Sequence, residues 1–189
     1  MIKRFAVLAA LLMIGESGSG FAQVSGCDQT CAAIKQILAN RANAYIALKG
    51  KKISDSLWES KLAPPGLYCT ILDFDAERGI PAYSEMDCGL RGVAGLDYPE
   101  AQVAPTFQML KRAISAAVPQ LKAFRVTDFS GYVADLREAD KDTLLYIGPS
   151  SKDYFMNLEY DQSLIQDVKL TVSSTDTDTS YPLVPYPLN

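Results

Sequence analysis

The sequence predicts an α+β fold in which two helices pack on an antiparallel sheet, in the order helix, two strands, helix and then a β-meander. Three observations lead to this class. Apolar residues recur at spacings of three and four within residues 28–48 and 97–118, as they do along one face of a helix. In several other segments they alternate with polar residues, which is typical of strands with one buried face. Helices and strands do not alternate regularly, so a parallel βαβ fold is disfavoured.

The first segment is expected to be an export signal rather than part of the fold. Lys3 and Arg4 precede an unbroken apolar run at residues 5–14, and small residues at positions 16–22 suit a cleavage region. Ten apolar residues fall well short of the roughly 20 that span a bilayer. We therefore expect a signal peptide at residues 1–22, cleavage near Ala22 and a periplasmic or secreted mature chain.

A second cleavage site competes with the first. Residues 24–27, with the sequence VSGC, resemble a bacterial lipobox, after which Cys27 would carry lipid. The apolar run lies ten residues away, and a lipidated Cys27 would leave an odd number of thiols in an oxidising compartment. Membrane attachment is accordingly expected only if Cys27 is lipidated.

The mature chain is expected to form a single α+β domain at residues 23–173, followed by an extended or flexible C-terminal tail at residues 174–189. Cleavage removes two of the 18 basic and one of the 22 acidic residues, so the net charge becomes 16 minus 21, or −5. Nucleic acids and anionic lipid surfaces require clustered Lys and Arg. The acidic balance argues against both as partners.

Helices and strands follow one another in this order. The first helix, at residues 28–48, is expected to stop at Gly50, and residues 53–62 suit either a helical turn or a loop. Two strands then form a hairpin, and the second helix starts near Asp97 and closes at Pro119, with Pro105 kinking it or marking a later start. The predicted strands are residues 67–74, 83–90, 132–137, 143–148, 154–160 and 167–173.

Four cysteines in an exported chain predict two disulfides, with three connectivities open. If residues 67–74 and 83–90 pair so that opposite positions sum to 157, Cys69 lies opposite Cys88, within reach of a disulfide. Cys27 would then pair with Cys31, and we favour these two local bonds. In the alternative, Cys27 and Cys31 staple the helix to the hairpin by pairing with Cys69 and Cys88.

The chain contains no histidine, which excludes Ser-His-Asp and Cys-His catalysis and every His-ligated metal site. We expect no cofactor. Asp73, Asp75 and Glu77 alternate at the hairpin tip and form a weak calcium candidate, because glycine and the bidentate glutamate are missing from the positions that a calcium loop requires. Catalysis would have to rely on carboxylate, lysine, tyrosine or unassisted serine chemistry. Paired carboxylates could cut glycosidic bonds, but nothing in the sequence singles out a pair.

Four aromatic residues are hard to bury, because they lie in predicted loops or in the tail: Trp58, Tyr98, Tyr181 and Tyr186. Protein interfaces favour Trp and Tyr, so these four form a candidate contact surface. The alternative for Trp58, which we favour, is that it packs under the sheet. The sequence thus favours a non-catalytic domain that binds another envelope or secreted protein, as an inhibitor, an immunity protein or an accessory of an envelope complex. The alternatives are a small-molecule or lipid binder with a pocket between sheet and helices, and a histidine-free carboxylate hydrolase.

Overall fold

The computed structural model describes residues 27–77, 79–90, 100–126, 141–147, 153–161, 167–178 and 183–186. The predicted signal peptide and the predicted strand at residues 132–137 lie outside these ranges. The described helices are α1 (Gln29–Asn40) and α2 (Glu100–Ala117). The described strands are β1 (Lys49–Lys52), β2 (Leu57–Ser60), β3 (Leu67–Phe74), β4 (Tyr83–Leu90), β5 (Lys122–Val126), β6 (Lys141–Ile147), β7 (Asp153–Asp161), β8 (Asp167–Asp178) and β9 (Leu183–Pro185).

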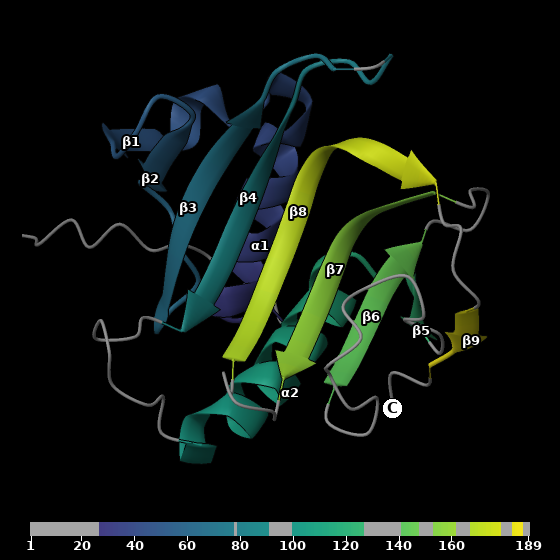
Figure 1. Ribbon diagram of the computed structural model, residues 1–189. Helices are drawn as coiled ribbons and strands as arrows, with labels where there is room; N and C mark the ends of the chain where they lie inside the picture. Colours follow the sequence, from purple (N-terminus) through teal and green to yellow (C-terminus); the bar gives the residue numbers. More distant parts are fainter. Residues whose placement is uncertain are drawn as a thin grey trace, which may run out of the picture.

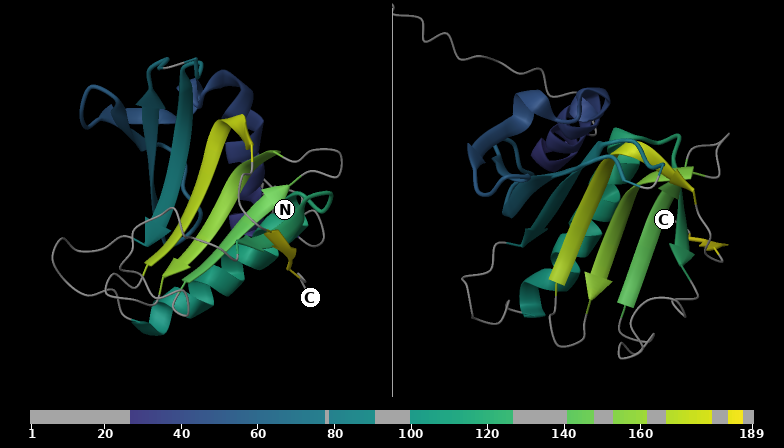
Figure 2. Two further views of the ribbon diagram at one scale, coloured as in Figure 1. Left: turned by 45° about the vertical axis from the view of Figure 1, so that its right-hand side comes forward. Right: turned by 45° about the horizontal axis from the view of Figure 1, so that its top comes forward.

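These strands form one antiparallel sheet in the order β1-β2-β3-β4-β8-β7-β6-β5-β9 (Figure 1). The body of the sheet consists of six neighbouring strands, in the order β3, β4, β8, β7, β6 and β5. The β1–β2 hairpin extends the sheet beyond β3, and the three-residue strand β9 pairs with β5 at the opposite end. Both helices lie on the same side of the sheet (Figure 2). The predicted fold class, two helices on an antiparallel sheet, is confirmed. Within the described residues, no helix is long and apolar enough to cross a membrane.

The first helix is shorter than its apolar period predicts. Asp28 caps its start by accepting a hydrogen bond from the Cys31 amide at 2.8 Å. The helix ends at Asn40 because Ala44 and Tyr45 adopt left-handed backbone conformations, with φ of 48° and 57°. Two 3₁₀ turns, η1 (Arg41–Asn43) and η2 (Ile46–Leu48), fill the remainder.

A tertiary contact explains this early end. The Tyr45 side chain is fully buried, and its hydroxyl donates to the Val172 carbonyl of β8 at 2.8 Å. Placing Tyr45 there requires the chain to leave the helix. Gly50 therefore lies inside β1 instead of stopping a helix, and a Cβ at this position would come within 2.8 Å of the Glu59 carbonyl oxygen on β2.

Residues 53–62 contain a strand rather than a helical turn or a loop. The amides of Ile53 and Ser54 both donate to the Leu57 carbonyl, which closes the β1–β2 turn. In β2, Trp58 then lies opposite Ile71 of β3. Pairing with β3 therefore determines the conformation of residues 57–60, in place of the helical turn that the capping-box pattern at residues 56–59 predicts.

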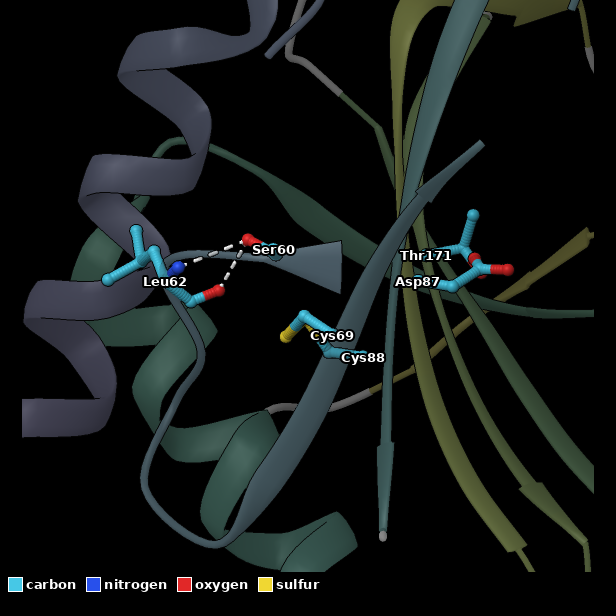
Figure 3. The surroundings of a disulfide bond; sticks show 6 residues. All are labelled: Ser60, Leu62, Cys69, Asp87, Cys88 and Thr171. Carbon is cyan, nitrogen blue, oxygen red and sulfur yellow. Dashed lines mark hydrogen bonds between the residues drawn. A yellow bond between two sulfur atoms is a disulfide. The ribbon is translucent and has the colours of Figure 1, made fainter. Parts of the chain in front are cut away.

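The β3–β4 hairpin has the predicted register. Leu67 faces Leu90, Cys69 faces Cys88 and Ile71 faces Met86. The structure contains a Cys69–Cys88 disulfide, which points toward the helices (Figure 3), and a Cys27–Cys31 disulfide at the start of α1. These are the two local bonds that the sequence favours.

The second helix begins at Glu100 and includes Pro105 within its length. Its inward face carries Phe107, Leu110 and Ile114, which are buried against the sheet and α1, and it ends two residues before Pro119. The burial of this apolar face therefore stabilises the helix across Pro105.

The sheet extends further along the chain than the predicted domain limit at residue 173. Strand β8 continues to Asp178, because the Arg41 guanidinium donates to the Ser173 carbonyl at 2.6 Å and forms an ion pair with Asp176. Residues 183–185 form β9, which pairs with β5. Residues 174–178 and 183–185 thus belong to the sheet and not to a separate tail. Pro185 is tolerated because β9 is an edge strand.

Candidate functional site

The two faces of the sheet carry different residues. The face toward the helices is apolar: Cys69, Ile71, Met86 and Leu170 are among the buried side chains there. Alternate residues of the same strands point to the other side, and Figure 3 shows Asp87 and Thr171 on the side of β4 opposite the disulfide. Neither described helix covers this side (Figure 1), which we call the open face. Along its central strands it carries Thr70, Leu72, Glu85, Asp87, Asn157, Glu159, Lys169 and Thr171.

Charged side chains meet at the centre of the open face, where β4 lies beside β8. The Lys169 ammonium lies 3.3 Å from a carboxylate oxygen of Asp87, and the Thr171 hydroxyl donates to the other oxygen at 2.6 Å. Glu85 is two residues from Asp87 on the same face, and Glu159 lies opposite Lys169 on β7. We call Glu85, Asp87, Glu159 and Lys169 the seam cluster.

The electrostatics of the seam cluster are unbalanced. Three carboxylates surround one ammonium, so the cluster has a charge of −3 plus 1, or −2, when all four are ionised. Burial and then the Asp87 charge raise the pKa of Glu85, and Lys169 only partly offsets them. Burial alone would lower the pKa of Lys169, but the charges of Asp87, Glu159 and Glu85 raise it. The fold therefore holds an excess of negative charge on half-buried side chains.

Aromatic rings flank the seam cluster on the N-terminal strands. Phe74 and Tyr83 stack with their ring centroids 4.5 Å apart and their planes inclined by 10°. Both share the face of Glu85, since they follow the same alternation along β3 and β4. Burial, followed by the Glu85 charge, raises the pKa of Tyr83. The open face thus combines half-buried rings with a charged centre.

The structure describes two of the four aromatic residues that are predicted to form a contact surface, Trp58 and Tyr186. Trp58 lies on β2 at one end of the sheet and Tyr186 follows β9 at the other end, while Tyr98 and Tyr181 lie outside the described residues. The Trp58 indole packs on the core and donates to Asp73 at 3.2 Å. The sheet order places the two described residues at opposite ends of the sheet, so they do not share one surface.

Asp73 is occupied by protein groups. Its carboxylate oxygens accept hydrogen bonds from the Lys49 ammonium at 2.7 and 2.6 Å, from the Ser84 hydroxyl at 2.7 Å and from Trp58. Burial would raise the pKa of Asp73, but these hydrogen bonds and the Lys49 charge together lower it. The carboxylate acts as a structural acceptor that fastens β1 and β2 to the hairpin.

The calcium candidate is not assembled. Asp75 and Glu77 are exposed on the β3–β4 connection, and Glu77 is engaged through its backbone with Ile80. In the part of the chain that the structure describes, no three Cys, Asp or Glu side chains are grouped so that they could hold a metal ion. Asp73 faces Lys49 instead of Asp75 and Glu77.

The seam cluster is absent from the sequence-based candidates. The alternation in residues 83–90 predicts that Glu85 and Asp87 lie on the face opposite Cys88. The sequence does not predict that β4 pairs with β8, because more than 75 residues separate Asp87 from Lys169 in the chain. Comparison with family models, with curated proteins and with solved structures finds no match for this chain, so the site rests on its own geometry.

Proposed function

We propose that this protein is an exported, non-catalytic binding domain that uses the open face to contact another envelope or secreted protein. The partner would present arginine or lysine side chains to the seam cluster and an apolar rim to the Phe74–Tyr83 pair. Nucleic acid is unsuited to this face, because phosphates would meet a net negative charge.

One observation carries the proposal. Glu85 is a half-buried carboxylate beside Asp87 on a central strand, and its pKa is raised because folding disfavours its charged form. A side chain that costs stability in the free protein suits a role in binding. A guanidinium from a partner would relieve the repulsion between Glu85 and Asp87 and would be held by charge-assisted hydrogen bonds.

The disulfides support the export part of the proposal. All four cysteines are paired, which is the state expected in an oxidising compartment. Cys27 is bonded to Cys31 and so has no thiol left to carry lipid. This favours cleavage near Ala22 over the lipoprotein alternative, and mass spectrometry of the mature chain tests it: a lipid adduct on Cys27 would contradict it.

The binding proposal is tested by comparing baits. The mature protein is immobilised and exposed to the envelope fraction of the producing cells, next to a Glu85→Gln/Asp87→Asn variant. Asp55→Asn serves as a control, because Asp55 is exposed and, among the described residues, forms an ion pair with Lys52. We expect a retained protein that elutes with salt, is lost with the double variant and is kept with the control. Equal retention by all three baits would contradict the use of the open face.

A carboxylate hydrolase is a second candidate, favoured by the same pair. Glu85 has a raised pKa while Asp87 is held by Thr171 and Lys169, and two carboxyl groups in unlike environments suit general acid and base roles. A panel of chromogenic glycosides would show turnover that Glu85→Gln abolishes. No turnover by the wild-type protein would leave binding as the function of the open face.

A further inference from the structure

A second polar site lies on the face of the sheet opposite the seam cluster, toward the end formed by β6, β5 and β9. Tyr146 of β6 faces the helices and is fully buried, with 0% of its surface exposed. Its hydroxyl has no hydrogen-bond partner, and it is the only such buried side-chain atom among the described residues. Buried hydroxyls normally find a partner, because desolvating one without compensation is costly.

Lys111 approaches the same region from α2. Only 9% of this lysine is exposed, although its side chain carries a full charge. In the described part of the chain it forms no ion pair with a carboxylate. Its ammonium instead lies 5.2 Å from the centre of the Tyr186 ring. Lysine is rarely buried to this extent without a paired anion.

Tyr186 links Lys111 to Tyr146. The Arg125 guanidinium lies 5.3 Å from the centre of the same ring, so two cations flank Tyr186. The Tyr186 amide donates to the Ala123 carbonyl at 2.9 Å, which fixes the ring over β5. Burial and the proximity of Tyr186 raise the pKa of Tyr146. Its hydroxyl therefore stays protonated and able to donate a hydrogen bond.

We infer that Lys111, Arg125 and Tyr146 form a binding site for a compact oxyanion, a carboxylate or phosphate group, beneath the Tyr186 ring. The ammonium and the guanidinium would supply charge, and the Tyr146 hydroxyl would donate a hydrogen bond that the free protein leaves unmade. The site is independent of the open face and of any partner that binds there.

The other end of the sheet shows what a purely structural arrangement of the same groups looks like. There, Lys49 and Lys52 flank the Trp58 ring at 5.5 and 5.6 Å, and the protein itself provides the anion, Asp73. Around Tyr186 the described residues place cations and an aromatic ring in the same way, but no carboxylate pairs with Lys111. An external anion would fill the role that Asp73 fills at the first end.

Thermal unfolding of the mature protein in increasing inorganic phosphate or acetate, at constant ionic strength, tests the site. We expect Tm to rise with at least one of the two anions and to saturate, and the response to each anion separates a phosphate from a carboxylate ligand. Lys111→Met should weaken half-saturation by about tenfold, because a charge-assisted hydrogen bond is lost. Lys51→Met, an exposed lysine of β1, should leave the response unchanged.

Tyr146→Phe gives an independent readout. Without added anion its Tm should equal or exceed that of the wild type, because the variant removes an unpaired buried hydroxyl. Its response to the anion should nevertheless be weaker. If Tm responds to neither anion, or if both Lys111→Met and Tyr146→Phe respond as the wild type does, the inference is overturned. Because Lys111→Met and Tyr146→Phe act at separate atoms, a folding defect in one still leaves the other as a test.

Discussion

The two halves of the chain differ in their disulfides and in how their polar side chains are paired. Residues 27–90 contain both disulfides and a carboxylate, Asp73, that accepts hydrogen bonds from three neighbours. Residues 100–186 contain no cysteine, and their described part leaves Tyr146 without a hydrogen-bond partner and Lys111 without an ion pair. The halves meet where β4 lies beside β8, and the seam cluster lies at that junction.

The pairing of polar groups distinguishes those that serve the fold from those that are candidates for binding. In the N-terminal half the buried polar groups satisfy one another, so the half needs no ligand to explain them. Among the described residues, the junction holds three carboxylates and one ammonium, and the C-terminal half leaves Lys111 without an ion pair and the Tyr146 hydroxyl without a hydrogen bond. Such groups cost free energy unless a ligand or partner completes them.

The largest expected effect is the loss of the hairpin disulfide. The Cys69–Cys88 bond closes a loop with a sequence separation of 19, so replacing both residues with alanine should lower the free energy of unfolding by about 3 kcal/mol. The Cys27–Cys31 bond has a separation of 4, and the same substitutions there should cost about 2 kcal/mol. Urea unfolding measures both, and a larger loss from the Cys27/Cys31 variant would contradict this order.

Asp73→Ala should cost about 1 to 2 kcal/mol, because it strands the Lys49 ammonium and the Trp58 indole. The folded pKa of Asp73 lies below its usual value of 3.8, so its stabilising contribution is present above that pH and is lost as pH falls through the folded pKa. The penalty measured by urea unfolding should therefore shrink below about pH 3.8. Asp55→Ala, which removes an exposed ion pair, provides the control and should change stability little. A penalty for Asp73→Ala that persists at low pH would argue against the ion pair as its cause.

Glu85→Gln should have the smallest effect and the opposite sign. It removes a carboxylate that Asp87 repels, and a gain of about 0.5 kcal/mol at neutral pH is the scale of such repulsion on a sheet. The folded pKa of Glu85 lies above its usual value of 4.5, so its cost develops as pH rises through this range. The gain should vanish in more acidic solution. Destabilisation by Glu85→Gln at neutral pH would show that this carboxylate serves the fold.

The sequence predicted what depends on local pattern. The Cys69–Cys88 register follows from alternation in two adjacent strands, and the start of α1 follows from Asp28. The end of α1 could not be predicted, because Tyr45 leaves the helix to reach Val172, more than 120 residues away. Pairing between distant strands determines the remainder of the sheet, and local periodicity carries no information about it.

The candidate site was missed for the same reason. Glu85 and Asp87 read as ordinary polar positions of a strand until β8 places Lys169 beside them. The sequence places Trp58 and Tyr186 in a loop and in the tail, whereas Trp58 lies on the short strand β2 and Tyr186 directly follows the short strand β9. Strands of three or four residues are too short for alternation to reveal them.

The proposed function requires that the open face bind a basic protein surface through the seam cluster. Its most direct test is a ¹H–¹⁵N NMR titration of the mature protein with a hexa-arginine peptide, with hexaglutamate as the control. We expect saturable, salt-sensitive shifts at Glu85, Asp87 and Lys169 that disappear in Glu85→Gln/Asp87→Asn. Shifts confined to the Trp58 or Tyr186 end, or no shifts at all, would contradict it.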